Sequence, residues 1–99
     1  MNDYKIQMFP SAKRDLAEMT YNLSAYYKST AIKQYDGIIE KINILKKFPF
    51  MYPEYKSSVS DLPYRRLVAN NYLVFYIVEG KTVVIHNIIN SRMNINEMI

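Results

Sequence analysis

Two adjacent arginines, Arg65 and Arg66, open the largely apolar stretch YRRLVANNYLVFYIVEG (64–80). Neighbouring residues of a strand point to opposite faces of its sheet, so one arginine is expected on each face. A third arginine, Arg92, follows the last apolar run of the chain. Guanidinium groups bind phosphates or carboxylates through paired hydrogen bonds. The three arginines are therefore candidates for a cationic site that binds phosphate of a target. The alternative is that Arg65 and Arg66 are solvated edge residues that discourage aggregation.

The single histidine, His86, lies in the middle of VVIHNII (83–89). A histidine can act as a general base, but no carboxylate or nucleophile near it in sequence supports that role. A structural role is the simpler interpretation, although His86 stays a catalytic candidate with the three arginines. The chain has no cysteine, no spacing typical of metal ligands and no glycine-rich phosphate loop. We therefore expect no metal and no cofactor.

The length of 99 residues predicts a single domain over 1–99. No apolar run approaches the length of a membrane span, and the first residues lack a secretory pattern, so we expect a cytoplasmic protein with no membrane partner. The net charge of +4 suggests an anionic partner, either nucleic acid or an acidic protein segment, unless it serves only solubility. Ten tyrosines suit half-buried surfaces and binding interfaces.

Apolar periodicity predicts the elements that must position these residues. A strand at 4–9 precedes two helices, the first from Ser11 to about Tyr27 and the second from Thr30 to Lys46 or Lys47, with Ser11 and Thr30 as N-caps. A long connector at 48–63 follows, and then come three strands at 64–69, 72–79 and 82–89, joined by turns at Asn70-Asn71 and Gly80. This order predicts an α+β fold in which an antiparallel helical hairpin covers one face of a small sheet, whose last three strands form an antiparallel meander.

The central strand of the meander is apolar on both sides. Tyr72, Val74, Tyr76 and Val78 share one face, and Leu73, Phe75 and Ile77 share the other. The helices can cover only one of these faces, and the alternation does not decide which. The second face must meet the C-terminal tail, the connector or another protein, so we expect an exposed apolar patch that binds a partner.

The chain resembles the RelE/ParE superfamily of toxins from bacterial type II toxin–antitoxin modules. The resemblance spans nearly the whole chain and is carried by PSAKRDLAEM (10–19), FPFMYPEY (48–55), YRRLVANNYLVFYIVEG (64–80) and VVIHNIINSR (83–92). It implies a helical hairpin on a small twisted antiparallel sheet, and a cognate antitoxin whose C-terminal segment wraps the toxin. The antitoxin would then contact one face of the central strand, through residues among Tyr72, Leu73, Phe75, Tyr76 and Ile77.

Activities in the superfamily divide into two branches. One branch cleaves messenger RNA on the ribosome without a metal, and the other poisons DNA gyrase. When the pattern of the nuclease branch is compared with this sequence, its basic positions are matched by Arg65, Arg66 and Arg92. Leu73 stands where a further arginine is expected, Met98 near the usual tyrosine, and Asn90 where some members have a histidine.

Cleavage of RNA through its 2′-hydroxyl needs a proton acceptor, a proton donor and cations. The arginines could supply the cations, but no residue is identified for the proton transfers, so whether the chain is an enzyme stays open. The resemblance therefore favours a growth-inhibiting toxin of plasmid-stabilisation type that acts on gyrase or on an undetermined target. The alternatives are a ribosome-dependent endoribonuclease using Arg65, Arg66 and Arg92, and a decayed, non-toxic module that only binds an antitoxin.

Overall fold

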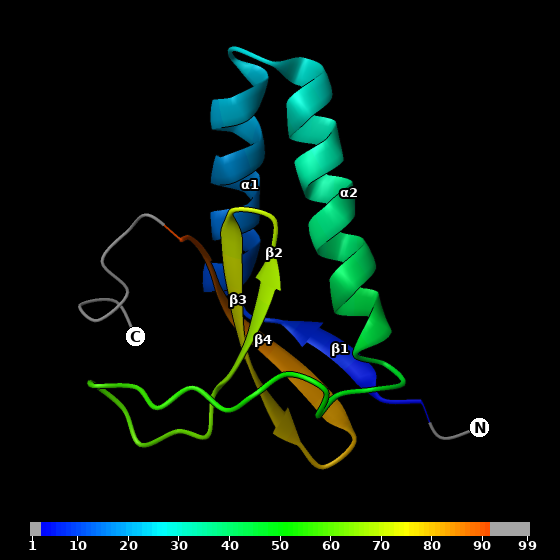
Figure 1. The fold of residues 1–99 in the computed structure, drawn as a ribbon, viewed down its shortest axis with the longest axis vertical. Coiled ribbons are helices and arrows are strands. Elements are labelled where there is room, and N and C mark those ends of the chain that lie inside the picture. Colours follow the sequence, from blue (N-terminus) through cyan, green and yellow to red (C-terminus); the bar gives the residue numbers. More distant parts are fainter. Residues whose placement is uncertain (1–2, 92–99) are drawn as a thin grey trace.

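The computed structural model describes residues 3–91, which form two helices and four strands (Figure 1). The elements are β1 (Lys5–Met8), α1 (Pro10–Ser24), α2 (Lys28–Ile44), β2 (Arg65–Ala69), β3 (Tyr72–Glu79) and β4 (Thr82–Asn90). The order strand, helical hairpin, three strands confirms the α+β fold expected from the sequence. Within these residues, neither helix is long and apolar enough to cross a membrane.

The four strands form one sheet in the order β1-β4-β3-β2. Both pairs of the meander, β2 with β3 and β3 with β4, are antiparallel as predicted, while β1 joins the β4 edge in parallel. Asn70 in the first turn has φ of 57° and Gly80 in the second has φ of 58°. Both residue types tolerate this left-handed conformation, which explains their place in tight turns.

The outer edge of β4 is shared between β1 and α1. Strand β1 pairs only with the first half of β4, and the amide of Phe9 still donates to the carbonyl oxygen of Ile85. Beyond this point α1 supplies the partners: Ser11 Oγ donates to the His86 carbonyl oxygen at 2.7 Å, and Asp15 Oδ2 accepts from the Ile88 amide at 3.0 Å. Helix α1 therefore completes the hydrogen bonding of an edge that the short β1 leaves open.

Both helices begin earlier than the sequence patterns suggested, so the N-cap assignments of Ser11 and Thr30 were wrong. The N-cap of α1 is Phe9, because the fixed φ of Pro10 suits the first helical position. Ser11 instead uses its hydroxyl on β4. The N-cap of α2 is Tyr27, and neither cap residue makes a side-chain cap hydrogen bond.

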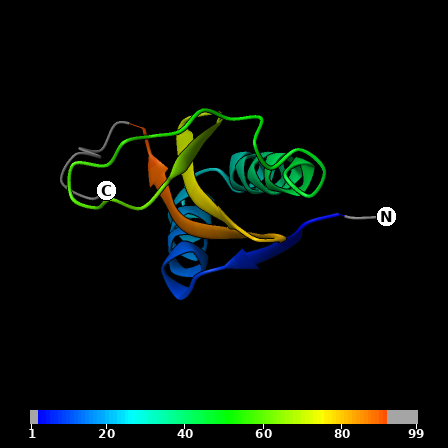
Figure 2. The same ribbon diagram turned by 90° about the horizontal axis from the view of Figure 1, so that it is seen from below.

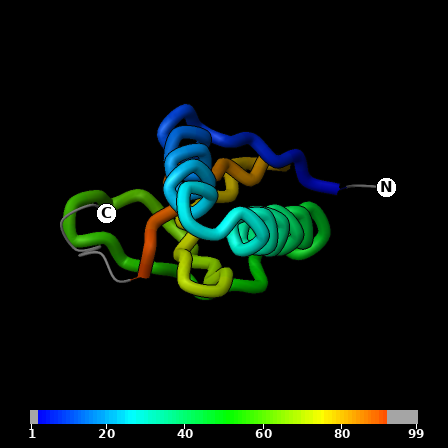
Figure 3. The backbone as a smooth tube through the Cα atoms, turned by 90° about the horizontal axis from the view of Figure 1, so that it is seen from above, coloured from blue at the N-terminus to red at the C-terminus, as the bar shows by residue number. Residues whose placement is uncertain are grey.

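The helices cover only one face of the sheet, as expected. The main core cluster joins helix residues such as Leu16 and Ile38 to sheet residues such as Leu67, Val74 and Tyr76. Figure 3, looking down the hairpin, shows α1 and α2 side by side. A second cluster contains no helix residue; its members are Tyr64, Leu73, Phe75, Ile77 and Ile89, with Tyr55 packed against them.

The connector between α2 and β2 runs along the outer edge of β2 (Figure 2). Glu54 forms an isolated bridge to Arg65; the Arg66 amide donates to the Pro53 carbonyl oxygen, and the Tyr55 amide to that of Tyr64. The beginning of the sheet edge opposite β1, around Arg65 and Arg66, is thus paired by the chain itself. This pairing limits strand addition by other molecules at that edge.

Candidate functional site

The alternation of β2 separates the two adjacent arginines. Arg65 lies opposite Tyr76, and Arg66 lies opposite Phe75. Tyr76 belongs to the cluster packed under the helices, whereas Phe75 belongs to the cluster on the other face. Arg65 therefore points to the helix side of the sheet and Arg66 to the face away from the helices.

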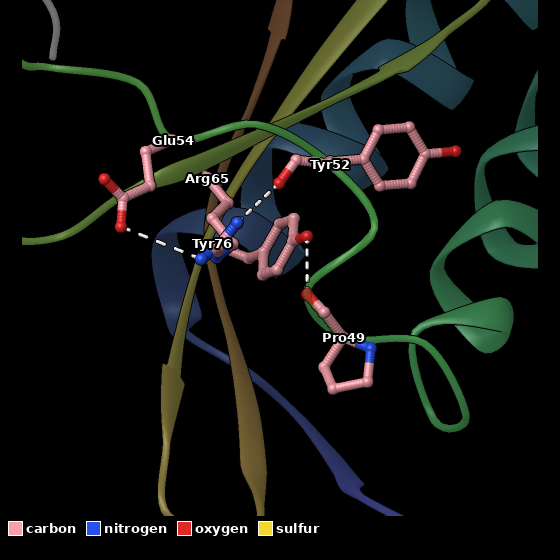
Figure 4. Close-up of polar contacts among 5 residues, drawn as sticks. All are labelled: Pro49, Tyr52, Glu54, Arg65 and Tyr76. Atoms are coloured by element: carbon pink, nitrogen blue, oxygen red, sulfur yellow. Dashed lines mark hydrogen bonds and ion pairs between the residues drawn. The ribbon is translucent and has the colours of Figure 1, made fainter.

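Arg65 is occupied by the connector (Figure 4). Its Nη1 donates to the Tyr52 carbonyl oxygen at 2.7 Å, and its Nη2 lies 3.7 Å from Glu54 Oε1. The guanidinium carbon lies 5.0 Å from the centre of the Phe50 ring, a cation–π arrangement. Because only 21% of this side chain is exposed, Arg65 serves as an anchor for the connector in this structure.

Tyr76 makes a second contact with the connector. Its hydroxyl donates to the Pro49 carbonyl oxygen at 2.8 Å, next to the Arg65 contacts in Figure 4. Burial raises the pKa of Tyr76 to about 12, although the Arg65 charge acts in the opposite direction. The hydroxyl therefore keeps its proton at physiological pH and remains a hydrogen-bond donor.

Arg66 is the freer member of the pair. Its guanidinium carbon lies 5.6 Å from the centre of the Tyr55 ring, and the residue is half-buried. Among residues 3–91, no carboxylate forms an ion pair with Arg66. Arg66 can thus present a charge on the face away from the helices, beside the exposed side chain of Val68.

Arg92, the third candidate for the cationic site, lies outside the described residues. Arg65 and Arg66 lie on opposite faces of β2, so the structure does not bring them together in one site.

His86 lies at an irregularity in β4. Phe75 pairs with Asn87 and Tyr76 pairs with Ile85, so His86 is the extra residue of a bulge. Its ring packs on Phe9 with the two centres 4.2 Å apart, and its Nδ1 lies 3.4 Å from the Tyr64 hydroxyl.

The other ring nitrogen of His86, Nε2, is buried and has no hydrogen-bond partner among the described residues. Burial lowers the pKa of His86, and the charge of Glu79 opposes this effect only in part. The ring is therefore neutral near pH 7 and packs between two aromatic side chains.

The five strand residues expected to bind an antitoxin divide between the two faces. Tyr72 and Tyr76 lie on the helix side, and Leu73, Phe75 and Ile77 lie on the other. The expectation that one set forms an exposed apolar patch was wrong, since Leu73, Phe75 and Ile77 are 8%, 0% and 2% exposed.

The connector explains much of this burial. The ring of Tyr55 meets the Phe75 ring at 5.0 Å between centres, and the ring of Tyr64 meets it at 6.5 Å. The length of the connector and its tyrosines were the available signal, since long loops without a role are uncommon. The sequence pattern could not show which strand the connector would cover.

The described part of the chain shows no candidate metal site. Residues 3–91 contain no group of three histidine, cysteine, aspartate or glutamate side chains placed to hold a metal ion.

Comparison with known families and with solved structures gives matches over most of the chain. A sequence model described as the ParE toxin of the type II toxin–antitoxin system parDE matches residues 6–95. A search of curated proteins found no match. Among solved structures, a chain titled "Chromosomal ParDE TA system from P. aeruginosa" is similar with a TM-score of 0.75 and 18% sequence identity. The similarity covers 91% of this chain and 98% of that chain, and at this identity it supports the fold alone.

Proposed function

The chain belongs to the ParE toxin family of type II toxin–antitoxin systems, and from this membership we propose that it inhibits growth by acting on DNA gyrase. As a toxin of this class it has a cognate antitoxin as its partner. The proposal adds that the antitoxin neutralises the toxin, and that both act in the cytoplasm.

The placement of His86 and Arg65 is the observation that favours gyrase over RNA cleavage. RNA cleavage needs an accessible proton acceptor and donor beside cations that stabilise the developing phosphate charge. His86 Nε2 is buried and the pKa of the ring is lowered, while the guanidinium of Arg65 is engaged by Tyr52 and Glu54. Residues 3–91 thus offer no assembled acid–base pair around a free cation.

For the antitoxin, we propose the face of the sheet away from the helices. Arg66 provides a cation there that can pair with an acidic group of the antitoxin. Val68 is 46% exposed beside it and provides an apolar contact. Leu73, Phe75 and Ile77 would support this surface from below, whereas Tyr72 and Tyr76 pack under the helices. Arg66, together with Arg92, is also the candidate for binding phosphate of the target.

The deciding experiment measures two activities of the purified full chain. We expect inhibition of gyrase supercoiling at a concentration that leaves translation in a cell-free extract unchanged, and growth arrest on induction that the antitoxin relieves. Ribosome-dependent cleavage of messenger RNA with unaffected supercoiling would instead identify the nuclease branch. Antitoxin binding without growth arrest and without either inhibition would identify a decayed module.

A further inference from the structure

A small cavity lies between the helical hairpin and the turn that joins β2 to β3. Its volume is about 190 Å³, and it is lined by Leu23, Thr30, Gln34, Asn71, Tyr72 and Asn90. This is below the roughly 300–1,000 Å³ of sites for drug-sized ligands, so it suits a single small ring or side chain. No charged side chain lines it.

Gln34 carries an unsatisfied hydrogen-bonding group in this wall. Its Oε1 atom is buried and has no partner among the described residues. Most buried side-chain oxygens in proteins accept a hydrogen bond, so an unpaired one calls for an explanation. The last torsion of a glutamine is soft, and its rotation can turn either the oxygen or the NH2 group towards the cavity. A neutral ligand with a donor beside an acceptor would supply the missing partner of Oε1 and pair with the NH2 group at the same time.

The turn is held close to α2 at this place. A Cβ atom added at Gly37 would lie 3.1 Å from Asn70 Nδ2, so the glycine allows the turn to approach the helix. Further along α2, Lys41 Nζ donates to the Val68 carbonyl oxygen at 3.0 Å. These contacts fix the width of the cavity.

The approach to the cavity is aromatic and positively charged. The end of the hairpin projects beyond the β2–β3 turn in Figure 1 and carries Tyr21, Tyr26 and Tyr27, which are 76%, 82% and 66% exposed. Residues 19–35 include Lys28 and Lys33 but no carboxylate. Exposed aromatic rings beside lysines are the means by which proteins hold unpaired nucleic acid, through stacking on bases and attraction to phosphates.

We propose that this cavity takes a nucleobase, and that the tyrosines and lysines of the hairpin end hold the neighbouring nucleotides of a single DNA strand. Asparagine and glutamine amides pair with the adjacent donor and acceptor of adenine, which makes adenine the preferred base. The aromatic ring of Tyr72 lies in the same wall. This inference goes beyond the proposed action on gyrase, because the toxin would contact nucleic acid directly, without gyrase.

The test measures fluorescence anisotropy of a labelled oligodeoxyadenylate, and of the same strand with abasic sites, on titration with the full chain at low salt. We expect the abasic strand to bind at least about tenfold more weakly. Gln34→Leu should weaken binding of the adenine strand by a similar factor and leave the abasic strand unchanged. Gln7→Leu, which changes an exposed glutamine on β1, is the matched control and should bind like the unmodified protein.

Two further experiments test the role of the lysine charges and whether the ligand is a free nucleotide or a strand. Lys33→Ala should weaken binding of both strands, whereas Lys46→Ala, in the turn just beyond the far end of α2, should have less effect. Competition by dAMP would show that the base alone is the ligand, and competition only by strands would show that the polynucleotide is needed.

Equal binding of adenine and abasic strands, or equal affinities of Gln34→Leu and Gln7→Leu, would overturn the proposal. It also fails if Gln34→Leu weakens only antitoxin binding, because the cavity would then serve a protein partner. Circular dichroism melts control for folding, and Gln34→Leu should melt no lower than the unmodified protein, since it removes an unpaired buried oxygen.

Discussion

At the scale of single residues, Arg65 and Arg66 have the same chemistry and different surroundings. Arg65 is bound to the connector through Tyr52 and Glu54, while Arg66 faces away from the helices beside Tyr55. The neighbouring positions therefore divide two tasks, stability of the connector and a free positive charge. Sequence alternation predicts that the two side chains diverge, but not which of them is engaged.

Substitution of each arginine by alanine should separate these tasks. Arg65→Ala removes a charge-assisted hydrogen bond and should lower the free energy of unfolding by about 1.5–3 kcal/mol. Arg66→Ala should cost about 0.5–1 kcal/mol, the worth of a partly exposed cation–π contact, while weakening antitoxin binding. Urea unfolding and a pull-down with the antitoxin measure the two effects. Equal losses of stability in the two variants would contradict the assigned roles.

His86 should give the protein a simple pH dependence, because it is the only histidine in the chain. Burial lowers its pKa in the folded state below the ordinary value of 6.5, so the unfolded state binds more protons as pH falls. Stability from this residue is therefore complete above pH 6.5 and declines progressively below it.

Urea midpoints between neutral and mildly acidic pH would measure the effect. His86→Phe, which keeps a ring against Phe9, should flatten the dependence in this window. An equally steep decline in the variant would assign the effect to carboxylates instead.

At the scale of elements, the contact between α1 and β4 replaces a strand pair by side-chain hydrogen bonds. Asp15 accepts from the amide of Ile88, which is 5% exposed, and Ser11 donates to the carbonyl oxygen of His86. The helix thereby fixes its own orientation on the sheet, and with it the place of the hairpin end.

Asp15→Ala should lower the free energy of unfolding by about 1–3 kcal/mol, because it leaves a buried backbone amide without a partner. Glu18→Ala, at an exposed position of the same helix, is the control and should change stability by no more than about 0.5 kcal/mol. Thermal and urea unfolding would measure both. Hydrogen exchange of the Ile88 amide should also accelerate in the first variant, and unchanged protection there would count against the role of Asp15.

The elements and the antiparallel meander could be predicted from periodicity and turn residues, but the face of the meander that meets the helices could not. The alternation in 72–79 gave a strand and two apolar faces, and Asn70 and Gly80 gave the turns. Which face meets the helices depends on the register with β4, including the bulge at His86, and no local pattern encodes it. The start of α1 was misplaced because a proline at the first helical position competes with serine as a boundary signal.

At the scale of the whole molecule, the two faces of the sheet are covered in different ways. The helical hairpin packs on one face together with Tyr52 of the connector, and Tyr55 and Tyr64 pack on the other face. The sequence showed that the second face needed a cover, and a partner protein was one of the options. Because the connector supplies much of that cover, the surface proposed for the antitoxin is on the β2 side, where Arg66 and Val68 lie.

Val68 provides the test of this arrangement. Its side chain is 46% exposed on the Arg66 side, so Val68→Asp should cost about 1 kcal/mol of stability at most. It should weaken antitoxin binding at least about tenfold, or about 1.4 kcal/mol, because a carboxylate would lie in the proposed apolar contact and beside the acidic groups expected to pair with Arg66.

Toxicity and neutralisation should then separate in cells carrying Val68→Asp. Growth should still arrest on induction, because the fold is intact and Arg66, the proposed phosphate contact, is retained, but the antitoxin should no longer restore growth. Ile44→Asp, at a 41% exposed position on α2 across the sheet, is the control and should stay neutralised. Leu73→Asp, at a buried position of the same face as Val68, should abolish toxicity by unfolding the protein. Normal rescue of Val68→Asp by the antitoxin would move the interface to another part of the molecule, because no substitution on this face is better placed to disturb a partner without disturbing the core.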